Sequence, residues 1–172
     1  MYSNNSAKLR KKLYLAPRFS AKSAISMSKQ ITDEQLDIDL SELNKTSEGS
    51  MVANLGITYT YIGTARVEAL MPVDERTCQP FGLLHGGASL AFAETLAGAG
   101  TIAQISPDER AVGQQVSGHH VSTALKGDTV KGVATLMHRG RTSHVWNVDI
   151  FSMSEGKLVS TARVLYCVLK KK

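Results

Sequence analysis

The sequence predicts an α+β fold in which one long central helix is wrapped by a curved antiparallel sheet of about six strands. A helical pattern of apolar residues runs from residue 86 to about residue 105. Runs in which apolar and polar residues alternate, as in strands, lie on both sides of this segment. The chain has 172 residues, the usual size of one domain with its own hydrophobic core. These observations favour a single layered domain.

The central helix is rich in small residues. Alanine or glycine occupies positions 88, 91, 93, 97, 98, 99, 100 and 103, which lie on several faces of the helix. Small side chains allow backbones to approach closely, which suits a helix enclosed by a curved sheet. We therefore expect the strands to pack directly against this helix.

A short helix and a hairpin are predicted ahead of the central helix. Thr32 is a candidate N-cap of an amphipathic helix that ends near Asn44. Residues 55–62 and 65–71 then form two strand-like runs joined through Gly63. The spacing indicates an antiparallel pair.

Four more strands are predicted after the central helix. They cover residues 111–122, 128–138, 143–153 and 157–169. Residues 125–128 and 154–157 contain glycine and charged residues typical of tight turns, so we expect hairpins at both places.

The net charge of +5 is concentrated in the first 30 residues. All 15 acidic residues lie at or after Asp33, whereas seven of the 20 basic residues precede it, so the rest of the chain has 13 basic residues and a net charge of −2. This argues against a nucleic-acid partner.

The basic leader at residues 1–30 precedes a single domain at residues 31–172. It is typical of an organellar transit peptide, of an untranslated leader with Met27 as the true start, or of a disordered tail.

The two cysteines, Cys78 and Cys167, are too few for a disulfide framework, so a reducing compartment is expected. The expected location is cytoplasmic, or organellar if the leader is a transit peptide. No apolar run approaches 18 residues, and a membrane partner is not expected.

A carboxylate in the middle of the apolar helix indicates a functional site. Residues 79–85 form a turn and a loop that deliver His85 to a Gly86-Gly87 helix start. Glu94 lies further along this helix, and its neighbours three and four residues away are small or apolar, with no cation. An unpaired carboxylate there either faces a cavity or has a raised pKa, and both suit a catalytic acid or base.

These residues carry a resemblance to a known family. The run Met71-Pro72-Val73-Asp74, the run from Gln79 to Gly87 and the following Glu94 resemble the hotdog-fold acyl-CoA thioesterases of the 4-hydroxybenzoyl-CoA and 1,4-dihydroxy-2-naphthoyl-CoA type, the PaaI-like branch. The resemblance covers residues 44 to 169 approximately. It implies the hotdog fold, hydrolysis of an aromatic or medium-chain acyl-CoA, and a homodimer or homotetramer with its active site at the dimer interface. Coenzyme A is then part of the substrate, and no other cofactor is expected.

The resemblance also implies roles for individual residues. Glu94 acts as nucleophile or as general base on water, and Gln79 and His85 of the other subunit orient the substrate. Gly86 donates its backbone N–H to the thioester carbonyl, with Gly87 beside it. A helix N-terminus suits this role because its free N–H groups and dipole favour developing negative charge.

The chain departs from the family pattern at Gly98, where many relatives place Ser or Thr to orient the water or the carboxylate. Thr95 is adjacent to Glu94 but points about 100° away on an ideal helix, and Thr101 lies further off. This departure motivates an alternative function, a non-catalytic acyl-CoA-binding protein. The sequence does not identify the acyl group.

Two further segments are candidate substrate-binding regions. His119 and His120 alternate faces on a strand, and the resemblance assigns His120 to the acyl pocket. The corresponding loop of the family meets coenzyme A, which assigns that role to Arg139, Gly140, Arg141, Thr142 and Ser143; guanidinium groups suit phosphates by charge and geometry. The spacing of the histidines does not form a metal-ligand set with carboxylates or thiols, so no metal is expected.

Overall fold

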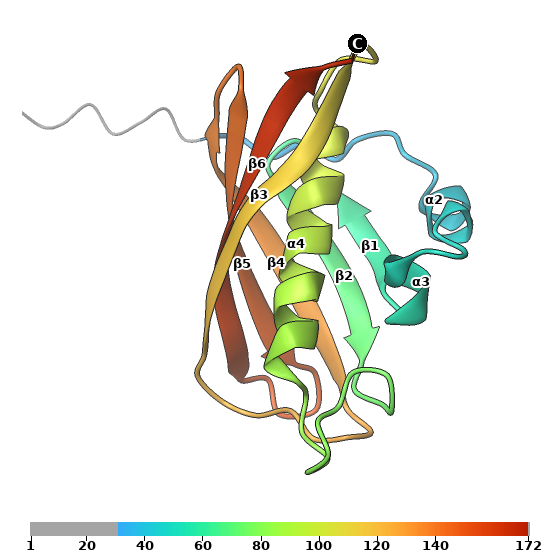
Figure 1. The fold of residues 1–172 in the computed structure, drawn as a ribbon. Coiled ribbons are helices and arrows are strands. Elements are labelled where there is room, and N and C mark those ends of the chain that lie inside the picture. The colour runs from blue at the N-terminus through green and yellow to red at the C-terminus, as the bar shows by residue number, and fades with distance from the viewer. Residues whose placement is uncertain (1–30, 172) are drawn as a thin grey trace, which may run out of the picture. The chain divides into compact units, whose positions relative to one another are not determined.

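The structure, a computed structural model, describes residues 31–171, and the leader predicted for residues 1–30 lies outside the described residues. Six strands form one antiparallel sheet in the order β1-β2-β4-β5-β6-β3, and helix α4 (Gly86–Ile102) packs against β2 to β6 (Figure 1). The strands are β1 (Thr58–Ile62), β2 (Arg66–Pro72), β3 (Glu109–His120), β4 (Thr129–Arg139), β5 (Ser143–Ser152) and β6 (Leu158–Lys170). The predicted architecture is confirmed.

Helix α4 begins at Gly86, as predicted, and ends at Ile102, about three residues earlier than predicted. Its small residues let the sheet approach closely, because a Cβ atom on Gly100 would lie 2.5 Å from Trp146 Cη2. The Trp146 indole donates a hydrogen bond to Thr101 Oγ1 over 2.9 Å, which satisfies its buried N–H. Among residues 31–171, no helix is long and apolar enough to cross a membrane.

The first predicted helix starts later than expected. Helix α2 covers Leu40–Thr46, and Asp39, rather than Thr32, is its N-cap and accepts from the N–H groups of Ser41 and Glu42. The preceding segment is extended because it pairs with the first hairpin, where Gln35 bridges Gly63. A second short helix, α3 (Met51–Asn54), was not predicted, and it delays the start of β1 to Thr58.

One of the two turns predicted to form hairpins after α4 does so. Residues 154–157 connect β5 to β6, which are neighbours, whereas residues 125–128 connect β3 to β4, which are not. The hairpin predicted at residues 125–128 was wrong, because this turn forms backbone hydrogen bonds with the segment ahead of α4 instead. Gly127 donates its backbone N–H to the Val73 carbonyl and Lys126 donates to the Gly82 carbonyl. This brings the segment that follows β3 beside the loop that leads into α4.

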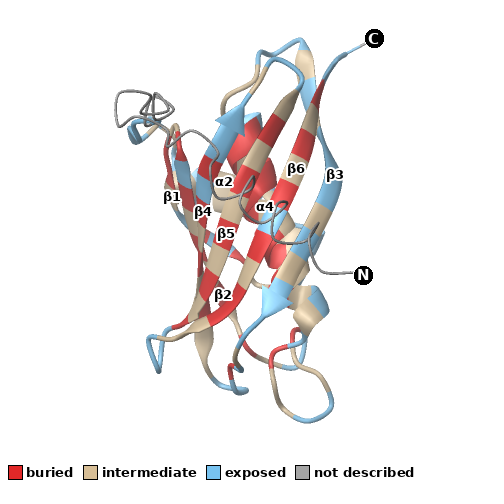
Figure 2. Ribbon diagram, turned by 90° about the vertical axis from the view of Figure 1, so that its left-hand side faces the viewer, coloured by how far each residue is buried: buried red, intermediate tan, exposed pale blue. Residues whose placement is uncertain are grey.

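The strands differ in how far their residues are exposed to solvent. Buried and partly exposed residues alternate along β5 and β6, whereas β3 is mostly exposed (Figure 2). Strand β3 is an edge strand and pairs only with β6 among the described strands. Its outer edge therefore offers unpaired backbone groups next to α4.

Candidate functional site

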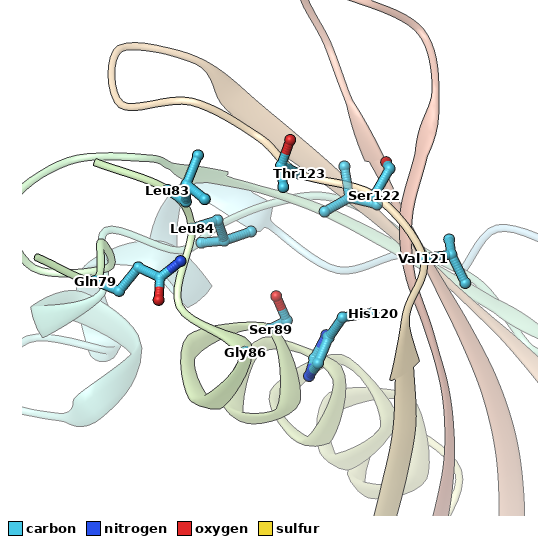
Figure 3. Close-up of a pocket in the computed structure, with 10 residues that line it drawn as sticks. Gln79, Leu83, Leu84, Gly86, Ser89, His120, Val121, Ser122 and Thr123 are labelled. Atoms are coloured by element: carbon cyan, nitrogen blue, oxygen red, sulfur yellow. The ribbon is translucent and has the colours of Figure 1, made fainter. Parts of the chain in front are cut away.

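A pocket of about 380 Å³ opens at the N-terminal end of α4. Gln79 and His120 face each other across it, with Ser89 of α4 between them (Figure 3). Gly86 and Leu84 also line the pocket. The structure thus brings together three of the predicted site residues, Gln79, Gly86 and His120.

His85 caps α4, and this bond determines its tautomer. Its Nδ1 accepts from the Gly87 N–H over 2.9 Å, so in the neutral ring Nε2 carries the proton. His85 is exposed, and its Nε2–H is available as a hydrogen-bond donor at the N-terminus of α4. The capping role and the predicted substrate-orienting role use different nitrogens and are compatible.

A buried serine holds His120. Its Nδ1 lies 3.1 Å from Ser160 Oγ, and the Ser160 hydroxyl is also 3.3 Å from the His119 carbonyl. When the serine donates to that carbonyl, Nδ1 carries the ring proton and Nε2 is an acceptor. Nε2 faces the start of α4, since a Cβ atom on Gly86 would lie 2.6 Å from it. His85 and His120 therefore lie at the same helix terminus.

The first two backbone N–H groups of α4 differ in whether they are free to bind a ligand. His85 uses the Gly87 N–H, whereas within residues 31–171 the Gly86 N–H has no hydrogen-bond partner. An unpaired N–H at a helix N-terminus is suited to stabilise an oxyanion, and it lies in the wall of the pocket.

Glu94 lies outside this pocket. It is eight residues after Gly86 on α4, which corresponds to about 12 Å along the helix axis. It is half-buried, and none of the ion pairs within the described part of the chain includes it. Its Oε1 lies against Gly113 of β3, in space that a Cβ atom on Gly113 would fill. The predicted site is thus divided into two halves within one chain.

The surroundings of Glu94 include a strand glycine and a tyrosine. Gly113 lies opposite Tyr166 in the β3–β6 pairing, and a β-bulge follows Gly113 directly. Tyr166 donates its hydroxyl hydrogen to the Glu94 backbone carbonyl over 3.0 Å. Bulges often lie next to active sites, where they redirect a strand. We call the residues Glu94, Gly113 and Tyr166 the carboxylate half-site, and Gln79, His85, Gly86 and His120 the pocket half-site.

Comparison with known proteins identifies the family. The model of the thioesterase superfamily matches residues 81–159. The proofreading thioesterase EntH of Cronobacter sakazakii (strain ATCC BAA-894) is 43% identical over 130 residues, which cover 76% of this chain and 93% of that protein. The chain belongs to the thioesterase superfamily.

Two further relatives agree with this assignment. The 1,4-dihydroxy-2-naphthoyl-CoA hydrolase of Escherichia coli (strain K12) is 39% identical over 132 residues, which cover 77% of this chain and 96% of that protein. The crystal structure of a Haemophilus influenzae thioesterase is 35% identical and has a TM-score of 0.73, covering 79% of this chain and 94% of that one. The predicted hotdog fold and thioester hydrolase activity are confirmed. The non-catalytic alternative has no support among these relatives.

The structure places the remaining predicted residues of the thioesterase away from the pocket. Thr95 donates its hydroxyl to the Ala91 carbonyl over 2.8 Å, so its hydrogen is used within α4. Arg139, at the end of β4, donates to Gln104 Oε1 over 3.1 Å, which puts the basic turn beside the C-terminal end of α4. This turn, which we define as Arg139, Gly140, Arg141, Thr142 and Ser143, lies at the opposite end of the helix from the pocket.

Sequence reasoning missed two residues of the carboxylate half-site, Gly113 and Tyr166, and also Ser160, which is hydrogen-bonded to His120. None of the three carries a motif of its own. A glycine in the middle of a strand is a signal for close approach of another group, and it could have indicated Gly113.

Both cysteines are free, and within residues 31–171 no group of three or more His, Cys, Asp or Glu side chains is arranged to hold a metal ion.

Proposed function

We propose that the thioesterase hydrolyses an aromatic or medium-chain acyl-CoA to the free acid and coenzyme A, without a resident cofactor. The observation that carries this proposal is the pair of groups that α4 presents. A free N–H at its start can polarise the thioester carbonyl, and an unpaired carboxylate in its middle can activate water. The pocket volume of about 380 Å³ accommodates an acyl group of this size. The Escherichia coli relative is named for a substrate of this class.

Each complete site would form between two copies of the chain. The half-sites lie about 12 Å apart along α4, too far for one thioester to meet both Gly86 and Glu94 of one chain. If two copies pair antiparallel through the free edge of β3, the Gly113 end of one strand approaches the His120 end of its partner. The exposed side chains of Val112 and Ile102 would become buried in this arrangement. A homotetramer would add a second such dimer.

In the proposed reaction, Gly86 holds the thioester oxygen while Glu94 of the other chain removes a proton from water. The water oxygen forms a bond to the carbonyl carbon, the C–S bond breaks, and the thiolate leaves with the electron pair of that bond. The proton held by Glu94 returns to the products. A single turnover in ¹⁸O-labelled water tests this role: we expect the label in the acid alone, whereas label in Glu94 would indicate that the carboxylate acts as nucleophile.

The basic turn is proposed to bind the phosphates of coenzyme A. Arg141 is exposed, and Arg139 uses one guanidinium nitrogen on Gln104, which leaves its other donors available. Location in the cytoplasm or in an organelle stays a prediction.

The test of the proposed function is free-thiol release from benzoyl, hydroxybenzoyl, phenylacetyl, hydroxynaphthoyl and straight-chain acyl-CoA esters. We expect Glu94→Gln to lower kcat roughly 1,000-fold while the fold is retained. Unchanged turnover in a folded Glu94→Gln enzyme would refute the role of this carboxylate.

Mixed dimers test whether the site is shared. Two impaired variants, Glu94→Gln and His85→Ala, are refolded or coexpressed in equal amounts. If Glu94 works with the pocket half-site of its partner, half of the dimers contain one intact site of two, and activity rises to about a quarter of the wild-type value. If each site lies within one chain, activity stays at the average of the two variants, about one twentieth of the wild-type value.

A further inference from the structure

Gly98 has no side chain, and the hydroxyl of Tyr166 lies in the space where one would be. A Cβ atom on Gly98 would lie 2.5 Å from Tyr166 Oη and 3.0 Å from Tyr166 Cζ. Tyr166 therefore occupies the space that any other residue at position 98 would fill. Glycine is destabilising inside a helix relative to alanine, and the close approach of Tyr166 explains its presence here.

The Tyr166 hydroxyl also makes the bond that a hydroxyl on residue 98 would make. Serine and threonine in a helix donate to the carbonyl four residues earlier, as Thr95 does to Ala91 and Thr101 does to Ala97 in α4, each over 2.8 Å. For residue 98 that carbonyl belongs to Glu94. Tyr166 donates to this carbonyl over 3.0 Å from the neighbouring strand β6.

The ring of Tyr166 and the Glu94 carboxylate meet at the same residue of β3. A Cβ atom on Gly113 would overlap Glu94 Oε1 and would lie 3.7 Å from Tyr166 Cζ. Burial raises the pKa of Tyr166 to about 12, and the negative charge of Glu94 acts in the same direction. Near neutral pH the hydroxyl thus keeps the proton that it donates to the Glu94 carbonyl.

We propose that Tyr166 is a positioning residue for Glu94, and that its hydroxyl replaces, in place and in bonding, the one that residue 98 lacks. It holds the backbone of the helical turn from which the carboxylate projects, while its ring confines the carboxylate against Gly113. This inference rests on the proposed function, because it assigns Tyr166 to the reaction in which Glu94 is the base.

The first test is Tyr166→Phe, which keeps the ring and removes the hydroxyl. We expect kcat for thiol release to fall roughly tenfold with KM nearly unchanged, because a small displacement of the base weakens the chemical step more than substrate binding. Tyr61→Phe is the matched control, since it also removes a hydrogen-bonded tyrosine hydroxyl, which donates to Asp33 over 2.8 Å, but from β1, at the other edge of the sheet. Wild-type kcat in Tyr166→Phe would overturn the proposal.

The second test moves the hydroxyl back to the helix. Tyr166→Val makes room at residue 98, and this background then receives either Gly98→Ser or Gly98→Ala, which differ by one oxygen atom. We expect kcat to be roughly threefold to tenfold higher with serine, because its hydroxyl reaches the Glu94 carbonyl. Equal kcat values in two folded double variants would show that the hydroxyl has only a structural role. If the double variants do not fold, the comparison of Tyr166→Phe with Tyr61→Phe decides.

These outcomes are separate from failure of the proposed function. A wild-type enzyme that releases no thiol from acyl-CoA esters, or that is unaffected by Glu94→Gln, would refute the function itself. An active wild-type enzyme that needs Glu94 and tolerates Tyr166→Phe would refute only the positioning role of Tyr166.

Discussion

The first turn and the middle of α4 hold the groups proposed to act in the reaction in opposite ways. At the first turn, polar partners orient each ring: Gly87 donates to His85, and Ser160 is hydrogen-bonded to His120. In the middle, Glu94 has no ion-pair partner among the described residues, and its carboxylate occupies space that Gly113 leaves free. A group that must present a donor or an acceptor in one direction is fixed by hydrogen bonds. A base that must take up a proton is positioned by packing, since a cation beside it would weaken it.

The largest effect in this comparison is expected from filling the space beside Glu94. Gly113→Ala would push the carboxylate away from β3, so kcat should fall roughly 100-fold, whereas KM should change little because the pocket half-site is untouched. Steady-state thiol release measures both constants. Gly49→Ala is a control for the added methyl group: it lies in open space at a φ of 75°, so it should lower stability and leave kcat unchanged. Normal kcat in Gly113→Ala would show that the position of the carboxylate does not depend on this glycine.

The pocket half-site can be changed in two graded steps at His85. Asparagine is a strong N-cap, so His85→Asn should keep the helix cap while it loses the Nε2–H donor, and kcat should fall roughly tenfold without loss of stability. His85→Ala should lose the same activity and, in addition, about 1 kcal/mol of unfolding free energy. Thiol release and chemical denaturation measure the two effects. Full activity in a stable His85→Asn enzyme would leave His85 with the capping role alone.

A smaller effect is expected at the basic turn, which belongs to neither half-site. Arg141→Gln removes one exposed charge, so KM for acyl-CoA should rise roughly threefold to tenfold, while kcat stays close to that of the wild type. The rise should shrink as ionic strength increases, because salt screens the attraction to phosphate. A short acyl thioester without the nucleotide is the control substrate, and Arg141→Gln should not affect it. Equal effects on both substrates would contradict a role in coenzyme A binding.

The smallest expected effect concerns His144, a buried histidine outside both half-sites. Burial lowers its pKa below the ordinary value of 6.5, and the positive charges of Arg139 and His138 act in the same direction, opposed by Glu109. The unfolded chain therefore takes up the proton more readily. The stability that neutral His144 contributes is present above pH 6.5 and is lost as the pH falls from there through the lower folded-state pKa. Melting temperatures between pH 7.5 and 5 should fall less steeply in His144→Gln than in the wild type; equal slopes would contradict this assignment.

Much of the fold and of the pocket half-site was predictable from the sequence. The helix start at Gly86 and the strands after it follow from local patterns, and Gln79, His85 and Glu94 stand in one continuous stretch. The start of α2 was not predicted, because pairing of Gln35 with the first hairpin outweighs the local capping signal at Thr32. The turn at residues 125–128 was misassigned because the same turn chemistry serves hairpins and crossovers.

The two residues that surround Glu94 in the carboxylate half-site were missed for a different reason. Gly113 and Tyr166 meet only through the register of β3 with β6, and residues far apart in the chain leave no local pattern that predicts such a pairing. The sequence showed that Gly98 departs from the family, but not that a side chain from another strand fills its place. Packing between elements, rather than propensity within them, decides this part of the site.

The contact between Gly98 and Tyr166 also constrains the order in which substitutions at the two positions can accumulate. While the tyrosine is present, any larger residue at position 98 collides with its hydroxyl, so that change alone is strongly disfavoured. If the tyrosine is first replaced by a smaller residue, position 98 becomes free to accept a side chain. The two positions are therefore epistatic, and the accessible route between a helix hydroxyl and a strand hydroxyl passes through a state that has neither.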